Sequence, residues 1–503
     1  MSSPNHLSPD DFQRLGHRMV DWIADYWRTV EQRRVLPDDP PGAVAAKLPE
    51  TFPETPAGDD EWGRIFADLD EIVAPGLTHW QHPGFFAYFP ANASFPAILA
   101  DLLCAGTGVQ GMLWSTGPAV TEIETRVLDW TADLLGLPEP FRSTAAHDQL
   151  GGGVIQGTAS ESTLTTLVAA RARALRADPG ADASRLTLYT STQAHSSVVK
   201  AAIIAGLARD PEDHTHLRLV PVDRELRMRP DALERMLRED TAAGKIPFWI
   251  GATCGTTAST AIDPLPAIAA ARDASSARAW IHVDAAFSGA SCVCPEFRWQ
   301  LDGIGRCESV VVNAHKWLLT NFDCSMLWTQ RRRDLTSALS ITPEYLRNEA
   351  SDAGAVIDYR DWQIPLGRRF RALKLWFVMR HYGAEGLRSF IREHVEWASR
   401  FESKIDADER FVLAAPRTTS LVCFACAAGD DATRELHKRL NDTGELFVSH
   451  AVLPVIDDRG EQTGSRYVIR FAVGGTSTRE RHVDRAWSLI DAEAQRVLAE
   501  AVR

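Results

Sequence analysis

The sequence predicts an α/β fold with a mostly parallel central sheet, followed by a smaller α+β domain. Between about residues 95 and 375, short apolar stretches such as LTLYTS (186–191) and PFWIGATC (247–254) alternate with helical stretches such as DALERMLRED (231–240). The apolar stretches have little polar alternation, which is typical of strands covered on both faces. After about residue 375, helices alternate with isolated strands such as RYVIRFAV (466–473), which indicates the smaller domain.

The first expected element is an amphipathic helix that begins at Ser8. Ser8 can cap the helix, Pro9 suits its first turn, and Asp10 and Asp11 lie near the positive end of its dipole. Apolar residues then recur at steps of three and four: Phe12, Leu15, Met19, Trp22, Ile23, Tyr26, Trp27 and Val30. Residues 35–62 are rich in Pro and acids and predict an extended connector. Either a second subunit or the chain's own body must cover this apolar face.

Composition narrows the classes of function. With 503 residues, of which 45% are hydrophobic and 24% charged, the chain is long enough for a large globular core. The formal net charge of −13 argues against a nucleic-acid partner. We expect a cytoplasmic protein without a membrane partner, because no basic leader and no run of about 18 apolar residues is present. The eight cysteines lie in apolar stretches, so we expect buried thiols and no metal site.

Two predicted strands end in polar residues that suit catalysis. Asp284 closes the strand 280–284, and Lys316 follows the strand 309–313. A buried lysine has a lowered pKa and becomes a nucleophile toward carbonyl groups. Ligands of parallel sheets bind beyond the carboxyl ends of the strands, so we expect both residues to face one crevice. Taken singly, either could be a surface-loop charge.

A glycine-rich stretch precedes the helix that follows residue 158. Thr158 and Glu161 fit a capping box, and the free N–H groups of that helix start suit a phosphate. A dinucleotide site is disfavoured, because the glycine spacing of residues 151–157 is one residue too long, whereas an ordinary flexible loop remains an alternative.

His195 follows the strand 186–191 and is expected at the same crevice as Asp284 and Lys316. A phosphate seat, an imidazole, a carboxylate and a lysine are what a pyridoxal phosphate site requires.

Longer segments are more specific than these motifs: HPGFFAYFP, GGGVIQGTASESTL, QAHSSVVKAA, HVDAAFSG, NAHKWLLTNFDCSMLW, DYRDWQIPLGRRFRALKLWF and RFAVGG. Through them the chain, from Leu7 to the last helix, resembles the group II pyridoxal phosphate decarboxylases, specifically the aromatic-L-amino-acid decarboxylase branch. The resemblance implies fold type I, the aspartate-aminotransferase fold. We therefore expect a dimer-forming helical arm over residues 1–94, a large cofactor domain over 95–373 and a small α+β domain over 374–503.

The resemblance also assigns roles to residues. Lys316 matches the lysine that holds pyridoxal 5'-phosphate as a Schiff base, Asp284 matches the carboxylate that keeps the ring nitrogen protonated, and His195 matches the imidazole stacked on the ring. Further cofactor contacts match Ala159, Ser160, Thr257, Asn313 and His315. Tyr345 matches a tyrosine, on a loop that is mobile in the family, that protonates the product carbon.

The implied substrate is an aromatic L-amino acid, and seven residues match the family's pocket: Trp80, Tyr88, Phe89, Ala91, Gln110, Met112 and Gly367. Gly367 matches a small residue associated with larger aromatic side chains. Ala91 stands where animal enzymes carry a threonine that can bond a catechol hydroxyl. Gln110 and Met112 replace residues contributed by the neighbouring subunit. We therefore expect decarboxylation of Trp, Phe or Tyr in preference to DOPA, in a homodimer with active sites at the interface.

Two other functions remain open. An aromatic aldehyde synthase begins in the same way but lets oxygen react before protonation, and such enzymes typically carry Phe at the position of Tyr345. Tyr345 therefore favours simple decarboxylation. A non-catalytic homologue acting as a binding partner is disfavoured because four residues are all present: Lys316, Asp284, His195 and Tyr345.

Overall fold

The computed structural model describes residues 6–144, 150–178, 180–341 and 356–501. A seven-stranded sheet with the order β1-β7-β6-β5-β4-β2-β3 forms its centre. The strands are β1 (Gly152–Gln156), β2 (Leu186–Ser191), β3 (Leu217–Val220), β4 (Ile246–Thr253), β5 (Trp280–Asp284), β6 (Ser309–Asn313) and β7 (Ser325–Thr329). The pairs from β3 across to β6 are parallel, whereas β7 is antiparallel to both β6 and β1. The predicted mostly parallel sheet is confirmed.

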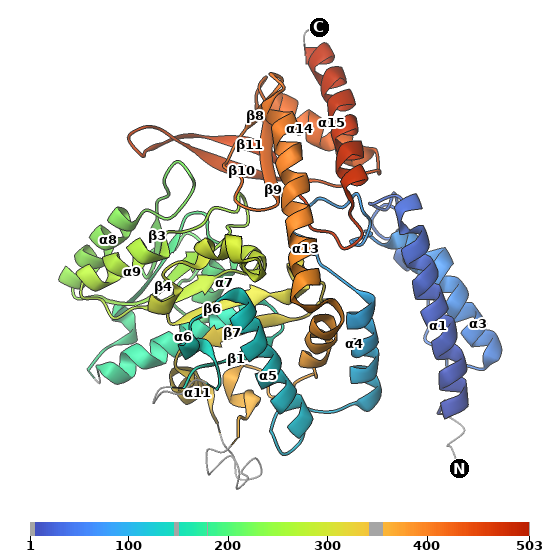
Figure 1. Cartoon of the computed structure of the whole chain (residues 1–503), viewed down its shortest axis with the longest axis horizontal. Helices are drawn as coiled ribbons and strands as arrows, with labels where there is room; N and C mark the ends of the chain where they lie inside the picture. The colour runs from blue at the N-terminus through green and yellow to red at the C-terminus, as the bar shows by residue number, and fades with distance from the viewer. Residues whose placement is uncertain (1–5, 145–149, 179, 342–355, 502–503) are drawn as a thin grey trace.

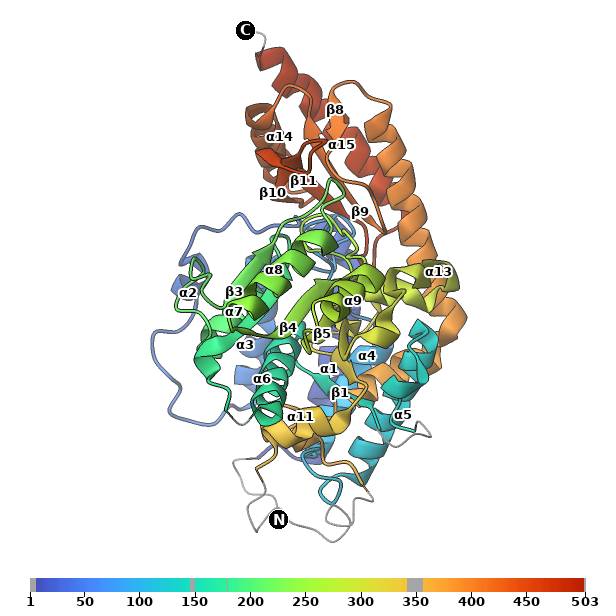
Figure 2. The same cartoon turned by 90° about the vertical axis from the view of Figure 1, so that its left-hand side faces the viewer.

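Helices cover both faces of this sheet (Figures 1 and 2). Neighbouring residues of β6 point to opposite sides, with Val310 in one buried cluster and Val311 in the other. The first cluster includes apolar residues of α5 (Pro118–Leu135), α8 (Pro230–Ala242) and α9 (Leu265–Ala274). The second includes those of α6 (Ala159–Ala177), α7 (Ser197–Ile204) and α11 (Arg332–Leu339). Two-sided burial explains why the strands are apolar throughout.

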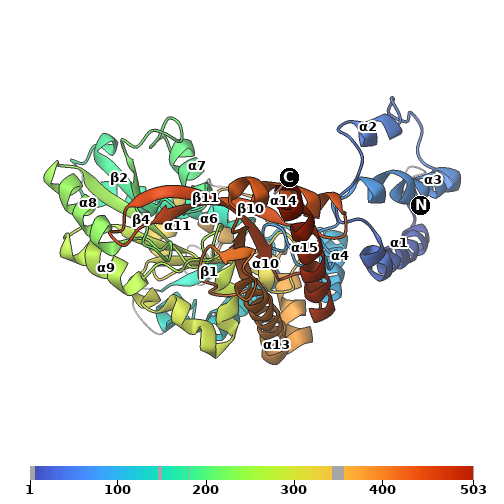
Figure 3. The ribbon, with the colours of Figure 1, turned by 90° about the horizontal axis from the view of Figure 1, so that it is seen from above.

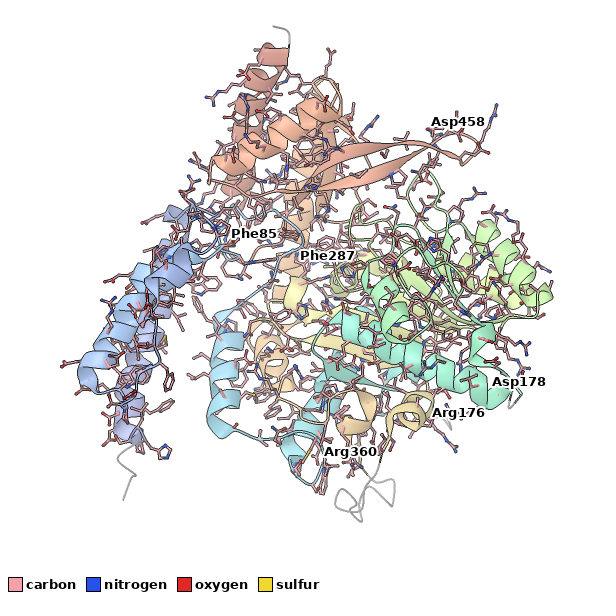
Figure 4. All side chains as sticks on the ribbon, turned by 180° about the vertical axis from the view of Figure 1, so that it is seen from behind. Phe85, Arg176, Asp178, Phe287, Arg360 and Asp458 are labelled. Atoms are coloured by element: carbon pink, nitrogen blue, oxygen red, sulfur yellow. The ribbon has the colours of Figure 1, made fainter. Side chains whose placement is uncertain are left out.

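A second, four-stranded antiparallel sheet has the order β10-β11-β9-β8. Its strands are β8 (Phe411–Leu413), β9 (Leu421–Cys426), β10 (Ser449–Ile456) and β11 (Gln462–Ala472), and its helices are α14 (Asp430–Asp442) and α15 (Glu480–Ala501). The long helix α13 (Ala372–Asp406), which bends at Gly383, extends from the larger part of the chain to β8 and β9 of the small sheet (Figure 1). The hairpin of β10 and β11 reaches back to the larger part of the chain, where Asp458 at its tip pairs with Arg224 (Figure 4).

The N-terminal helices α1 (Pro9–Thr29), α2 (Ala43–Lys47) and α3 (Asp59–Asp68) stand beside the body (Figure 3), followed by α4 (Phe95–Thr107). As predicted, Ser8 caps α1, its hydroxyl accepting the Asp11 N–H at 3.1 Å. The apolar face of α1 is partly covered by the chain itself, because Trp27 packs 5.1 Å from the ring of Phe95 at the start of α4. Phe12 remains 58% exposed, so part of this face is uncovered.

Short turns complete the fold: η1 (Val30–Gln32), η2 (Leu69–Val73), η3 (Ala74–Gly76), η4 (Glu139–Phe141), η5 (Ala183–Arg185), η6 (Ser288–Val293), η7 (Pro295–Leu301), η8 (Ile304–Arg306), η10 (Tyr359–Trp362) and the one-turn helix α10 (Ala314–Trp317). Within the described ranges, every helix is too short or too polar to span a membrane. All eight cysteines are buried free thiols, as expected.

Candidate active site

A cavity of about 230 Å³ lies beyond the carboxyl ends of β4, β5 and β6. Its lining consists of Phe89, Thr158, Ala159, Ser160, His195, Thr253, Gly255, Thr257, Asp284, Ala286, Phe287, Asn313, His315, Lys316 and Phe322. All eight residues predicted to contact a cofactor are among them. The cavity lies where ligands of parallel α/β sheets bind, so sheet topology and side-chain chemistry indicate the same place.

Lys316 projects from α10, directly after β6. Its Nζ lies 5.5 Å from the centre of the Phe89 ring and makes no hydrogen bond or ion pair with any described residue. Burial lowers the pKa of Lys316, and the charge of Arg470 lowers it further, while Asp284 opposes both effects. Lys316 therefore offers an amine that loses its proton more readily than an exposed lysine does, as a carbonyl nucleophile requires.

Asp284 is held at the end of β5 by the neighbouring backbone. Its Oδ1 accepts the Ala286 N–H at 3.0 Å, and the Ala286 carbonyl accepts the Asn313 N–H at 3.0 Å, which ties the ends of β5 and β6 together. The charge of the carboxylate opposes the burial that lowers the pKa of Lys316 and of His195, so it acts across the cavity. Asn313 Oδ1 is buried without a partner among the described residues, which leaves one acceptor at the site to be satisfied by a ligand.

Burial favours the uncharged form of both imidazoles of the site. Burial chiefly, together with the charge of Lys316, lowers the pKa of His195, and the same causes lower the pKa of His315 to about 4. His195 Nδ1 accepts the Ser197 N–H at 3.1 Å, so the ring carries its proton on Nε2. An uncharged ring held in this way is suited to packing against an aromatic ligand.

The start of α6 lines the cavity with backbone N–H groups that suit an anion. The Thr158 hydroxyl caps the helix, with the Glu161 N–H at 3.5 Å, but Glu161 Oε2 accepts the N–H of Gly157 at 3.0 Å and not that of Thr158, so the predicted capping box is shifted by one residue. The first N–H groups of the helix, at Ala159 and Ser160, have no helical acceptor and favour a negatively charged group. With Lys316 and Asp284, this donor set fits pyridoxal phosphate, which has an aldehyde, a ring nitrogen and a phosphate to be bound.

Aromatic rings form one wall of the cavity. Phe89 stacks on Phe287 with 3.8 Å between ring centres, and Phe287 stacks on Trp317 at 4.8 Å (Phe287 is labelled in Figure 4). Trp80 and Tyr88 stack on each other at 5.8 Å and remain 39% and 52% exposed. Phe89 thus lines the cavity, whereas the other two predicted wall residues lie outside its lining.

The remaining predicted pocket residues lie elsewhere in the chain. Gln110 Oε1 accepts the Arg368 N–H at 3.2 Å, and a Cβ added at Gly367 would lie 3.5 Å from the same oxygen. The Met112 carbonyl accepts the Arg360 N–H at 3.1 Å. The cavity of the same chain is lined by none of these three residues.

Two further predicted residues complete the set. The Ala91 carbonyl, two residues beyond Phe89, accepts the Gln81 side-chain N–H at 2.6 Å, and Ala91 itself does not line the cavity. Tyr345 lies outside the described residues. Its role as proton donor stays a prediction.

Several lining residues were missed by the sequence reasoning. Gly255 has φ +91°, and a Cβ there would meet Ser288 Oγ at 2.0 Å, so only glycine fits beside Thr253 and Thr257. The glycine in TCGTT, directly after the strand 246–253, was the available signal. Phe287 carried no comparable signal, because an aromatic residue in an apolar stretch usually belongs to the core.

Comparisons with known proteins agree with this geometry. The family model described as "Pyridoxal-dependent decarboxylase conserved domain" matches residues 41–427. The chain is 44% identical to tryptophan decarboxylase 2 of Oryza sativa subsp. japonica, covering 99% of this chain and 97% of that protein. It is also 44% identical to phenylacetaldehyde synthase of Arabidopsis thaliana, covering 98% of each. The structure of Oryza sativa TDC with PLP and tryptamine superposes with a TM-score of 0.91 at 40% identity, covering 99% of both chains.

Proposed function

The chain belongs to the pyridoxal-dependent decarboxylase family, and on this basis we propose that it converts an aromatic L-amino acid to the corresponding arylalkylamine and CO₂. The family and the cofactor expected from the sequence are confirmed. The observation that carries the proposal is the single cavity lined by Lys316, Asp284, His195 and the start of α6. The names of two relatives, a tryptophan decarboxylase and a phenylacetaldehyde synthase, support an aromatic substrate.

Each residue that lines the cavity has its own role in this reaction. When bound, pyridoxal phosphate supplies an aldehyde that joins to amines and a ring that accepts the electron pair released as CO₂ leaves. Lys316 supplies the amine that holds this aldehyde in place. Asp284, oriented by the Ala286 N–H, holds a proton on the ring nitrogen. His195 would pack against the ring of the bound cofactor, and the N–H groups of Ala159 and Ser160 would hold its phosphate.

Substrate preference tests the proposal directly. Ala91 has no hydroxyl to bond a catechol, so kcat/KM is expected to be higher for Trp, Phe or Tyr than for DOPA. A panel of L-amino acids, with amines identified by mass, measures this. Ala91→Thr should raise kcat/KM for DOPA by about fivefold, the effect of one added hydrogen bond. DOPA as the clearly best substrate of the unaltered enzyme would contradict the proposed preference, and no amine from any aromatic amino acid would contradict the function.

The second candidate is an aromatic aldehyde synthase, favoured by the 44% identity to phenylacetaldehyde synthase. Such an enzyme consumes O₂ and releases aldehyde, ammonia and peroxide as well as CO₂. Measuring peroxide against CO₂ separates the two functions: a ratio near one means aldehyde synthesis, and a ratio near zero means decarboxylation. A non-catalytic homologue would yield neither product, and would retain no borohydride-reducible cofactor.

Replacing Tyr345 with Phe is expected to shift the product from amine toward aldehyde. The substitution removes the hydroxyl proposed to protonate the product carbon, so oxygen gains time to react, while the cofactor stays bound. Amine and aldehyde are quantified by mass from the same reaction. Tyr359→Phe is the matched control, because the Tyr359 hydroxyl bonds Thr125 at 3.0 Å and does not line the cavity. Unchanged amine output from Tyr345→Phe would remove Tyr345 from the mechanism.

We also propose that the enzyme is a homodimer with active sites at the interface. The support is an apolar surface that the chain leaves uncovered on α1 and α4: Phe12, Val20, Leu99, Leu102 and Leu103. Exposed apolar area of this kind favours association. Three predicted pocket residues do not line the cavity of their own chain and would then be free to line that of the neighbouring subunit: Gln110, Met112 and Gly367.

We propose a cytoplasmic location, because free cysteines favour a reducing compartment.

A further inference from the structure

Tyr88 has a backbone conformation that its side chain disfavours. Its φ of +51° lies in the left-handed region, which residues other than glycine, asparagine and aspartate rarely enter. Such a conformation persists only where the surrounding structure holds it, and it often occurs at functional sites. Tyr88 immediately precedes Phe89, the aromatic wall of the cavity, so whatever holds Tyr88 also sets the direction in which Phe89 points.

Two side chains of the small sheet hold Tyr88 from both sides of its backbone. The Ser449 hydroxyl, at the start of β10, accepts the Tyr88 N–H at 2.9 Å. The Arg470 guanidinium, on β11, donates to the Tyr88 carbonyl at 3.1 Å and to Ser449 Oγ at 2.7 Å. Ser449 and Arg470 are 8% and 3% exposed, so water does not compete for these bonds.

The same guanidinium reaches the cofactor side of the cavity. Arg470 donates to the carbonyl of Thr257 at 2.6 Å and to that of Ala258 at 3.1 Å. Its Cζ lies 5.2 Å from the centre of the Phe89 ring, and Lys316 Nζ lies 5.5 Å from the same centre. One buried arginine of the small sheet therefore bonds the backbone of both Tyr88 and Thr257 and lies beside the Phe89 ring.

We infer that Ser449 and Arg470 are positioning residues that fix the aromatic wall of the substrate pocket from the small sheet. They act through the backbone of Tyr88 and Thr257, and neither lines the cavity. The inference rests on the proposed function, because it assigns Phe89 to substrate binding. For Ser449 it predicts a loss of substrate affinity rather than of chemistry, since Ser449 is uncharged and bonds the Tyr88 N–H and Arg470 rather than Lys316 or Asp284.

Ser449→Ala in the holoenzyme tests this inference. Loss of the hydroxyl frees the Tyr88 N–H, so KM for the preferred aromatic amino acid is expected to rise about fivefold, with kcat within about twofold of the unaltered enzyme. Ser449→Thr, which keeps the hydroxyl, should restore KM. Thr433→Val is the matched control: the Thr433 hydroxyl, on α14, accepts the N–H of Cys426 on β9 of the small sheet at 3.0 Å, so its loss should leave KM unchanged.

A second measurement does not depend on activity. Trp80 stacks on Tyr88, so the fluorescence that Trp80 contributes, obtained by subtracting the Trp80→Phe protein, should change in Ser449→Ala and return in Ser449→Thr. An unchanged KM and unchanged Trp80 emission in Ser449→Ala would overturn the inference, as would an equal rise of KM in Thr433→Val. An unaltered enzyme that makes no amine contradicts the proposed function instead, and the fluorescence comparison still decides whether Ser449 holds Tyr88.

Discussion

Replacing Lys316 with alanine is expected to abolish turnover, lowering kcat by at least about 10³-fold. Lys316 is the lysine that lines the cavity, and its amine is free of hydrogen bonds and ion pairs within the described structure. Burial lowers its pKa, so it can give up a proton and join to an aldehyde. Alanine removes the nucleophile and leaves the rest of the fold unchanged. Amine formation measures turnover, and borohydride reduction followed by mass measurement detects cofactor joined to the protein.

The matched control is Lys374→Met, at a lysine that is only 1% exposed. Lys374 Nζ pairs with Asp101 Oδ2 at 3.3 Å and does not line the cavity. Breaking that pair should lower thermal stability, because Asp101 loses one of its cationic partners and keeps Asn321 and Arg369, but the borohydride adduct should remain. If Lys316→Ala retains both the adduct and amine formation, another residue holds the cofactor and the assignment of Lys316 is wrong.

Local sequence patterns predicted part of the cofactor side of the cavity, whereas Thr257, Asn313 and His315 were expected there only through the family resemblance. Asp284 and Lys316 follow apolar strands, and parallel strands bring their carboxyl ends to one edge, so topology alone places both side chains together. The helix cap at Thr158 is likewise a short-range signal, and the structure contains it, although Glu161 bonds the Gly157 N–H and not that of Thr158. The direction of β7 could not be read in this way, because an apolar stretch such as 325–329 is compatible with either orientation.

Long-range contacts explain what the sequence could not predict. Ser449 and Arg470 lie more than 350 positions from Tyr88 in the chain, and no periodicity links them. Arg470 belongs to the RFAVGG segment, and nothing in the neighbouring sequence distinguishes a buried arginine from one at the surface. The predicted substrate pocket also divides in space: Phe89 lines the Lys316 cavity, while Gln110 and Gly367 lie against each other elsewhere. In the described residues, all eight predicted cofactor contacts line one cavity, whereas Phe89 alone of the seven predicted pocket residues does.

Asp284→Asn is expected to lower kcat by about 10²–10³-fold while the cofactor remains attached to Lys316. Asparagine has nearly the same shape and its carbonyl can still accept the Ala286 N–H, so the ends of β5 and β6 should keep their positions. What is lost is the negative charge that stabilises a protonated ring nitrogen and raises the pKa of Lys316 and His195. Binding survives because the N–H groups of α6 and the Lys316 amine are untouched.

Asp129→Asn provides the comparison for this last prediction. Asp129 is 5% exposed and accepts the N–H groups of Ser143 and Thr144 at 2.8 and 3.2 Å, away from the cavity. Its substitution should lower the thermal midpoint, because a charge-assisted acceptor becomes a neutral one, with kcat unchanged. If Asp284→Asn lowers kcat no more than Asp129→Asn does, the carboxylate serves the fold alone. A loss of kcat confined to Asp284→Asn, with the borohydride adduct still present, assigns the lost charge to the chemical step.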